Sequence, residues 1–173
     1  MVGIETAGSL NILFTDKTGT LTKGKLEVIG FTSGSLKRYS NEVELSRYPK
    51  LHDIVTTSIL YNNASTYDEN HKAIGGNTTD RALLEFIQSN AIRQYSIIDT
   101  VPFSSKNKYS MATIQKNGKL NLIKGAPEKI IPYCTNYISE LGEKKSLYNK
   151  KDINEYISMM TRKGIRVIAL ATS

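Results

Sequence analysis

The segment that most directly indicates the fold is Tyr109–Ile123, with the sequence YSMATIQKNGKLNLI. Two strand-sized runs, Tyr109–Gln115 and Lys119–Ile123, flank the dipeptide Asn117-Gly118. Asn-Gly is a preferred pair for a two-residue hairpin turn, because both positions of that turn need positive φ angles. The segment therefore predicts a two-residue β-hairpin, and with it an antiparallel sheet.

The sequence around this hairpin predicts further strands and several helices. The additional strands are expected at Lys25–Thr32, Tyr95–Val101 and Ile165–Ala171. The helices are expected at Lys50–Ser65, after a cap at Thr78, at Pro127–Cys134, and at Lys151–Lys163 with Gly164 as the stop. Tyr67–Asn77 is polar, contains Gly75-Gly76 and predicts a loop. The expected fold class is α+β, an antiparallel sheet flanked by helices.

Length and composition set limits on the class of protein. A chain of 173 residues with 39% hydrophobic and 23% charged residues suits one domain, or one domain plus a short piece of another. A single cysteine, Cys134, excludes a disulfide framework. The net charge of +7 favours an anionic partner, which could be nucleic acid, acidic lipid or a nucleotide. Because the lysines are spread along the chain, an ordinary solvated basic surface is the alternative interpretation.

The N-terminal part contains the heptapeptide DKTGTLT, Asp16–Thr22, directly after the apolar run Asn11–Thr15. The run predicts a buried strand, and a carboxylate at the end of such a strand points into the crevice where ligands bind in α/β sheets. Asp16 can there attack the γ-phosphate of ATP and form an aspartyl-phosphate. Lys17 and Thr18 supply donors, and Mg²⁺ is expected at Asp16 and Thr18. The alternative is a polar turn in which Asp16 acts only as a cap.

This heptapeptide is similar to the phosphorylation signature of the P-type ATPases at all seven positions. The resemblance implies an ATPase that transports cations through an aspartyl-phosphate. A second class, the soluble haloacid-dehalogenase-like phosphatases, also uses an aspartate nucleophile. Those enzymes normally carry a second acid two residues later, which activates water. That position is Thr18 here, which favours the transporter over the phosphatase.

Two later segments resemble the nucleotide-binding domain of the same family. In Gly76–Leu84, Asp80 stands where the family has an acid that helps to hold the adenine amino group. An acid favoured by the helix dipole is the alternative. In Pro102–Met111, Phe103 corresponds to the platform on which adenine stacks, and Lys108 to a lysine near the nucleotide. For Phe103 the alternative is a core aromatic residue.

Two more segments complete the resemblance. In Lys124–Glu128, the resemblance places Lys124 against adenine and ribose, while Gly125 allows a close approach of the backbone to the ligand. In Lys163–Thr172, Arg166 corresponds to an arginine that contacts a nucleotide phosphate, a task that suits a planar guanidinium. A surface charge at the edge of a strand is the alternative for Arg166.

The resemblance implies that the chain is a piece of a longer membrane transporter. Residues 1–23 are expected to be a short stub of the phosphorylation domain, and residues 24–173 the nucleotide-binding (N) domain, on the cytoplasmic side. Its partners would be ATP and the remaining phosphorylation, actuator and transmembrane domains. The piece alone is expected to be monomeric and to bind ATP without turnover. Nucleic acid is not expected, because interleaved aromatic and basic residues are lacking. Ala126-Pro127-Glu128 favours a calcium-type or related cation pump.

Overall fold

The computed structural model describes residues 26–87 and 93–173. The predicted strand Asn11–Thr15, the motif Asp16–Thr22 and the expected domain boundary after residue 23 lie outside these ranges. Within the two described ranges, no helix combines the length and the apolar character that crossing a membrane requires.

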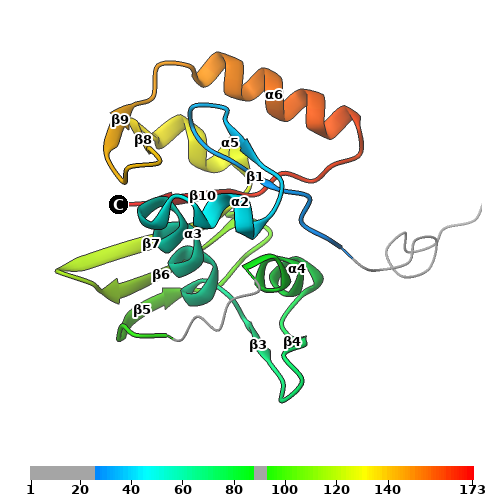
Figure 1. The fold of residues 1–173 in the computed structure, drawn as a ribbon, viewed down its shortest axis with the longest axis vertical. Helices are drawn as coiled ribbons and strands as arrows, with labels where there is room; N and C mark the ends of the chain where they lie inside the picture. Colours follow the sequence, from blue (N-terminus) through cyan, green and yellow to red (C-terminus); the bar gives the residue numbers. More distant parts are fainter. Residues whose placement is uncertain (1–25, 88–92) are drawn as a thin grey trace, which may run out of the picture.

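A four-stranded antiparallel sheet with the order β10-β7-β6-β5 forms the centre of the structure (Figure 1). Its strands are β5 (Ile97–Val101), β6 (Tyr109–Gln115), β7 (Lys119–Gly125) and β10 (Ala169–Thr172). The predicted β6–β7 hairpin is confirmed, and Asn117 and Gly118 take positive φ angles of 51° and 116°. The predicted length of the hairpin turn, two residues, is wrong. Gln115 pairs with Lys119, so Lys116 belongs to the turn together with Asn117 and Gly118. The Lys116 N–H donates to the Gly118 carbonyl at 2.8 Å.

The predicted helices are present, with shifted ends. They are α3 (Pro49–Tyr61), α4 (Thr78–Ile87), α5 (Pro127–Ile130) continued by a 3₁₀ turn (Ile131–Tyr133), and α6 (Lys150–Arg162). A short helix that the sequence analysis missed, α2 (Glu42–Ser46), precedes α3. Helix α3 ends before the expected Ser65 because Asn62 leaves the helical conformation, with φ −108° and ψ 51°. The α-helical bonding of α5 cannot continue because Pro132 has no N–H.

The predicted loop Tyr67–Asn77 is wrong, since its ends form a hairpin of β3 (Ser65–Tyr67) and β4 (Ala73–Gly75). Figure 1 shows this hairpin projecting from the rest of the structure. Its turn is closed by the Asp68 carboxylate, which accepts the backbone N–H groups of Asn70 and Lys72 at 2.9 Å each. Strands of three residues are too short to show a hydrophobic alternation in the sequence.

Two other short hairpins were not predicted, and three predicted strands are shorter than expected. The hairpins are β1 (Phe31–Thr32) with β2 (Arg38–Tyr39), and β8 (Asn136–Ile138) with β9 (Lys144–Ser146). The strand expected at Lys25–Thr32 is paired only at its end, and the one expected at Ile165–Ala171 begins at Ala169. Strand β5 begins at Ile97 instead of Tyr95, and β10 begins at Ala169 because its partner β7 ends at Gly125.

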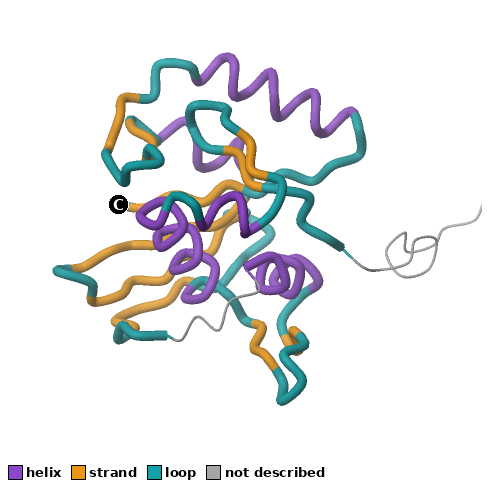
Figure 2. The backbone as a smooth tube through the Cα atoms, viewed as in Figure 1, coloured by secondary structure: helices purple, strands orange, loops and turns teal. Residues whose placement is uncertain are grey.

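The hydrophobic core lies where α3 and α4 meet each other and the sheet. Helix α3 contacts both α4 and β7, and Figure 2 shows the purple helices beside the orange strands. The largest fully buried side chains are Tyr39, Leu45, Ile59, Ile87, Ile114 and Leu122. Helix α6 is more peripheral, with Met160 as its buried residue. The α+β expectation, an antiparallel sheet flanked by helices, is confirmed.

Gly125 marks a close approach between β7 and the start of β6. A Cβ atom at Gly125 would lie 2.4 Å from the Lys108 carbonyl oxygen and 2.6 Å from the Tyr109 Cα atom. This glycine was expected to allow a close approach of the backbone to a ligand. In the structure the close neighbour is the protein's own backbone, so Gly125 keeps the two strands together at this edge of the sheet.

We expect Gly125→Ala to lower the free energy of unfolding by about 1–3 kcal/mol, since neighbouring backbone must move to admit the methyl group. Urea denaturation measures this as a lower midpoint with an unchanged slope. Gly164→Asn is the control, because Gly164 has φ 75° with no atom within 4 Å of an added Cβ, and asparagine tolerates that conformation. Equal midpoints for Gly125→Ala and the wild type would contradict the close approach.

Candidate functional site

A buried ion pair joins α4 to β7. The Asp80 carboxylate and the Lys124 ammonium are in direct contact, and their side chains are only 7% and 9% exposed. Lys124 also donates to the backbone carbonyl of Asn62, the residue that follows α3. Removing two charges from water is costly unless further hydrogen bonds satisfy them. The stability of the buried pair therefore depends on the further hydrogen bonds that Asp80 and Lys124 form.

The Asp80 carboxylate accepts its other hydrogen bonds from one backbone amide and one side-chain amide. Its Oδ2 accepts from the Ala64 N–H and from the Asn77 side-chain amide, at 3.3 Å each. In return, Asn77 Oδ1 accepts the Asp80 N–H at 2.9 Å, which makes Asn77 the cap of α4. The prediction that Thr78 is the cap is wrong, since Thr78 is the first residue of the helix. Asp80 thus lies in the first turn, where the helix dipole favours a carboxylate.

Two consecutive asparagines complete the surroundings of the pair. Asn63 donates from its side chain to the Asp80 carbonyl at 2.9 Å. The side-chain amide of Asn62 donates to the Ser110 carbonyl on β6 and to the Leu122 carbonyl on β7, at 3.0 Å each. Asn62, Asn63 and Asn77 were not among the predicted site residues. A detectable signal was present, because asparagine is favoured at both ends of helices and these residues flank α3 and α4.

Lys124 retains donor capacity for a ligand. An ammonium group has three N–H bonds. Asp80 and the Asn62 carbonyl accept from this group, and the residues described in the structure offer it no third acceptor within hydrogen-bond distance. The ammonium is therefore firmly held and can still donate one hydrogen bond to a polar atom of a bound molecule.

Phe103 lies on the loop that joins β5 to β6 and is 57% exposed, so the alternative of a core aromatic residue is wrong. The loop is fixed at its end: the Lys108 N–H donates to the Ser104 carbonyl at 2.7 Å, and the Lys108 carbonyl accepts the Ala126 N–H at 2.9 Å. Because Tyr109 pairs with Gly125, this loop leaves the sheet where β7 ends. Phe103 and Lys124 therefore belong to the same edge of the sheet.

Lys108 already has a carboxylate partner. Its Nζ lies 3.2 Å from Glu128 Oε1, and both side chains are more than half exposed. A hydrogen bond from its own backbone N–H, followed by the one from Lys108, holds the pKa of Glu128 below its ordinary value. Glu128 belongs to the first turn of α5, which follows β7 directly. The pair thus lies beside the same edge of the sheet.

Arg166 lies between α6 and β10, before the strand in which it was expected, and its side chain is exposed. It borders a hollow of about 350 Å³ whose lining is Pro127, Glu128, Ile157, Thr161, Gly164, Ile165, Arg166 and Val167. Glu128 is common to this hollow and to the ion pair with Lys108. The structure therefore brings Phe103, Lys108, Lys124, Gly125 and Arg166 to the region around the end of β7, with Asp80 paired to Lys124.

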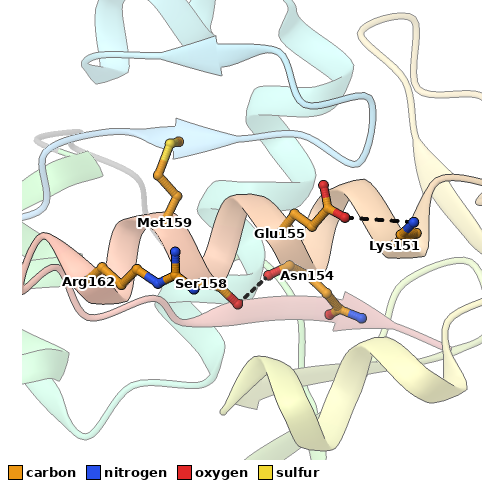
Figure 3. Close-up of a pocket in the computed structure, with 6 residues that line it drawn as sticks. All are labelled: Lys151, Asn154, Glu155, Ser158, Met159 and Arg162. Atoms are coloured by element: carbon orange, nitrogen blue, oxygen red, sulfur yellow. Dashed lines mark hydrogen bonds and ion pairs between the residues drawn. The ribbon is translucent and has the colours of Figure 1, made fainter.

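A second hollow, of about 580 Å³, lies along α6 and is lined by Lys151, Asn154, Glu155, Ser158, Met159 and Arg162. Figure 3 shows that all six side chains project from this one helix. The interactions drawn there stay within the helix, between Lys151 and Glu155 and between Ser158 and Asn154. None of the residues expected to bind a nucleotide lines it, so this hollow is an exposed helix face.

The expected Mg²⁺ ligands Asp16 and Thr18, with Lys17, lie outside the described residues. Within residues 26–87 and 93–173, no group of three or more His, Cys, Asp or Glu side chains could hold a metal ion. Magnesium binding thus stays a prediction.

We expect the loss of one partner of the buried pair to be far more damaging than the loss of an exposed one. Lys124→Met leaves the Asp80 carboxylate buried without its counter-charge, at a cost of about 3–5 kcal/mol in the free energy of unfolding. Lys108→Met removes an exposed pair and is the matched control, with an expected cost below about 1 kcal/mol. Urea denaturation measures both values. Similar losses in the two variants would contradict a buried pair.

Comparison with known proteins identifies the family to which the chain belongs. Residues 50–173 match the family model described as "P-type ATPase, cytoplasmic domain N". The chain is 33% identical to Calcium-transporting ATPase 1 of Saccharomyces cerevisiae, in an alignment covering 97% of this chain and 20% of that protein. It is 30% identical to Calcium-transporting ATPase 1 of Schizosaccharomyces pombe, in an alignment covering 98% of this chain and 21% of that protein. The chain spans about a fifth of the length of these relatives. It belongs to the P-type ATPase family, and residues 50–173 correspond to cytoplasmic domain N of that family.

Proposed function

We propose that this chain is the ATP-binding part of a P-type cation-transporting ATPase. One observation carries the proposal: the exposed ring of Phe103 and the buried, firmly held ammonium of Lys124 share the edge of the sheet where β7 ends. An exposed aromatic face suits stacking with a planar base. A held donor at the same end of the sheet suits the polar atoms of the base or the ribose. The relatives, which are calcium- and cation-transporting ATPases by name, support the same assignment.

On the base side of this site, Phe103 stacks against adenine and Lys124 donates to adenine or ribose. Asp80 keeps the ammonium of Lys124 in place and accepts from the adenine amino group. Its oxygens already accept hydrogen bonds from protein groups. A carboxylate offers about four acceptor positions, so one more donor can be accommodated. Gly125 contributes indirectly, because it allows the loop that carries Phe103 to stay next to β7.

On the phosphate side, Lys108 and Arg166 supply positive charge. The ion pair between Lys108 and Glu128 is exposed, and exposed pairs stabilise a protein by at most about 1 kcal/mol. A nucleotide phosphate can therefore take Lys108 from Glu128 at little cost. Arg166 offers a planar guanidinium suited to two phosphate oxygens at once.

For the whole transporter, we propose that Asp16 is the nucleophile that accepts the γ-phosphate, with Lys17 and Thr18 donating to the phosphate. Mg²⁺ bound at Asp16 and Thr18 would neutralise charge on the phosphate oxygens. Residues 1–23 then belong to the phosphorylation domain and residues 24–173 to the N domain, on the cytoplasmic side of a membrane protein. The comparisons do not favour the alternative of a soluble phosphatase. The 173-residue chain alone is expected to be monomeric and to bind ATP without turnover.

We expect Phe103→Ala to weaken ATP binding by about tenfold, because stacking on an aromatic ring contributes about 1–3 kcal/mol per base. Isothermal titration calorimetry on the 173-residue chain measures the dissociation constant. Tyr148→Ala is the control, since Tyr148 is also a highly exposed aromatic residue (92%) and precedes α6. If Phe103→Ala binds ATP as tightly as wild type does, the site is wrong.

We expect the full-length protein to incorporate radioactive phosphate from γ-labelled ATP into an acid-stable product. Asp16→Asn should abolish this labelling, because an amide cannot act as the nucleophile. Phe103→Ala should retain it at saturating ATP, with a weaker apparent affinity. Labelling that persists in Asp16→Asn would exclude Asp16 as the phosphorylated residue.

A further inference from the structure

Asn62 is buried next to Lys124, and all of its polar groups form hydrogen bonds. Its backbone N–H donates to the Ser58 carbonyl at 3.3 Å, and its backbone carbonyl accepts from Lys124. The side-chain amide donates to the Ser110 and Leu122 carbonyls, and its oxygen accepts from the Ser110 hydroxyl at 2.7 Å. With 7% of its surface exposed, Asn62 joins the end of α3 to the two central strands.

We propose that Asn62 is a positioning residue that fixes the Lys124 ammonium for the nucleotide. The inference rests on the proposed ATP site. A lysine side chain has a flexible four-carbon stem, and its ammonium has no preferred direction of its own. Two acceptors hold the Lys124 ammonium in one place. They are the Asp80 carboxylate at the start of α4 and the Asn62 carbonyl at the end of α3.

The backbone of Asn62 makes its carbonyl available for this contact. Its φ and ψ of −108° and 51° lie outside the helical region, so the chain turns away from the axis of α3 at this residue. Carbonyl groups in the last turn of a helix have no partner within the helix. Here the Lys124 ammonium is the donor, and the end of α3 contributes an acceptor to the site.

The side chain of Asn62 sets where that carbonyl lies relative to Lys124. It binds Ser110, which pairs with Lys124 across the β6–β7 ladder, and Leu122, which lies two residues before Lys124 on the same strand. The acceptor and the strand that carries the donor are thereby tied together through the amide. Any movement of α3 relative to β7 would have to break these hydrogen bonds first.

Asparagine is well suited to this position. Its amide supplies two N–H donors for two carbonyls and one oxygen for the Ser110 hydroxyl. An ionised aspartate has no donor and would place a charged oxygen against both carbonyls. Glutamine has the same groups on a longer stem, which would push α3 away from the strands.

The test compares Asn62→Ala with Val55→Ala in the 173-residue chain. Val55 is a buried residue of α3 (4% exposed), so its truncation weakens the packing of the same helix and leaves the hydrogen bonds of Asn62 in place. Two quantities are measured at a temperature where both variants are folded. One is the ¹H–¹⁵N signal of the Lys124 side-chain ammonium without nucleotide, and the other is the dissociation constant for ATP.

We expect Asn62→Ala to shift or remove the Lys124 ammonium signal and to weaken ATP binding by about tenfold, the effect of losing a well-placed hydrogen bond to a charged group. Val55→Ala should change neither quantity, even if it lowers the unfolding midpoint as much. An unchanged ammonium signal together with unchanged ATP affinity in Asn62→Ala overturns the proposal, as does an equal loss of affinity in Val55→Ala.

Ser110→Ala is the milder variant for the case in which Asn62→Ala does not fold. It removes the hydrogen bond from the Ser110 hydroxyl to the Asn62 side chain and the weaker one, at 3.5 Å, to the Lys124 backbone carbonyl, and it keeps the two amide contacts. A shifted ammonium signal with ATP binding weakened by about twofold supports the proposal. No change in either quantity overturns it. If wild type binds no ATP, the proposed function fails as well. If Phe103→Ala weakens binding and Asn62→Ala does not, only the role of Asn62 fails.

Discussion

The contact between Asp80 and Lys124 is the interaction on which the arrangement of this domain depends. Two opposite charges lie almost fully out of water, a state that is stable only with good geometry and further hydrogen bonds. The structure provides these from the end of α3, from the start of α4 and from the residues between them. The end of α3 and the start of α4 are thereby fixed around one pair of charges, together with the strand β7, which lies much further along the chain.

The candidate site combines one buried group and one exposed group at the end of β7. The Lys124 ammonium is buried and restrained, whereas the Phe103 ring is largely exposed. The strand pairing places both at the same end of the sheet, because β5 ends, β6 begins and β7 ends there. In the function proposed above, a base approaches the open ring while its polar atoms reach a donor that is already in position. We propose that this division suits reversible nucleotide binding.

Much of the fold could be predicted from local sequence, but the contacts of the site could not. Asn117-Gly118 located the central hairpin, and helical periodicity located α3, α4 and α6. The three-residue strands of the outer hairpins were missed, because they are too short for a periodic pattern. Family motifs pointed to Asp80 and Lys124 separately. Their pairing joins residues 44 positions apart, and such a contact depends on the whole chain. The role of Asn62 was missed for the same reason.

The order of strands in the central sheet also has a consequence for the time course of folding. Strands β5, β6 and β7 are close in sequence and can pair soon after they leave the ribosome. Strand β10 contains Ala169–Thr172, and it must cross an interval of more than 40 residues to pair with β7. Closing so long a loop is slow compared with forming a hairpin. Until β10 arrives, one edge of β7 is open to pairing with other chains, so the nascent domain is most prone to aggregation in that interval.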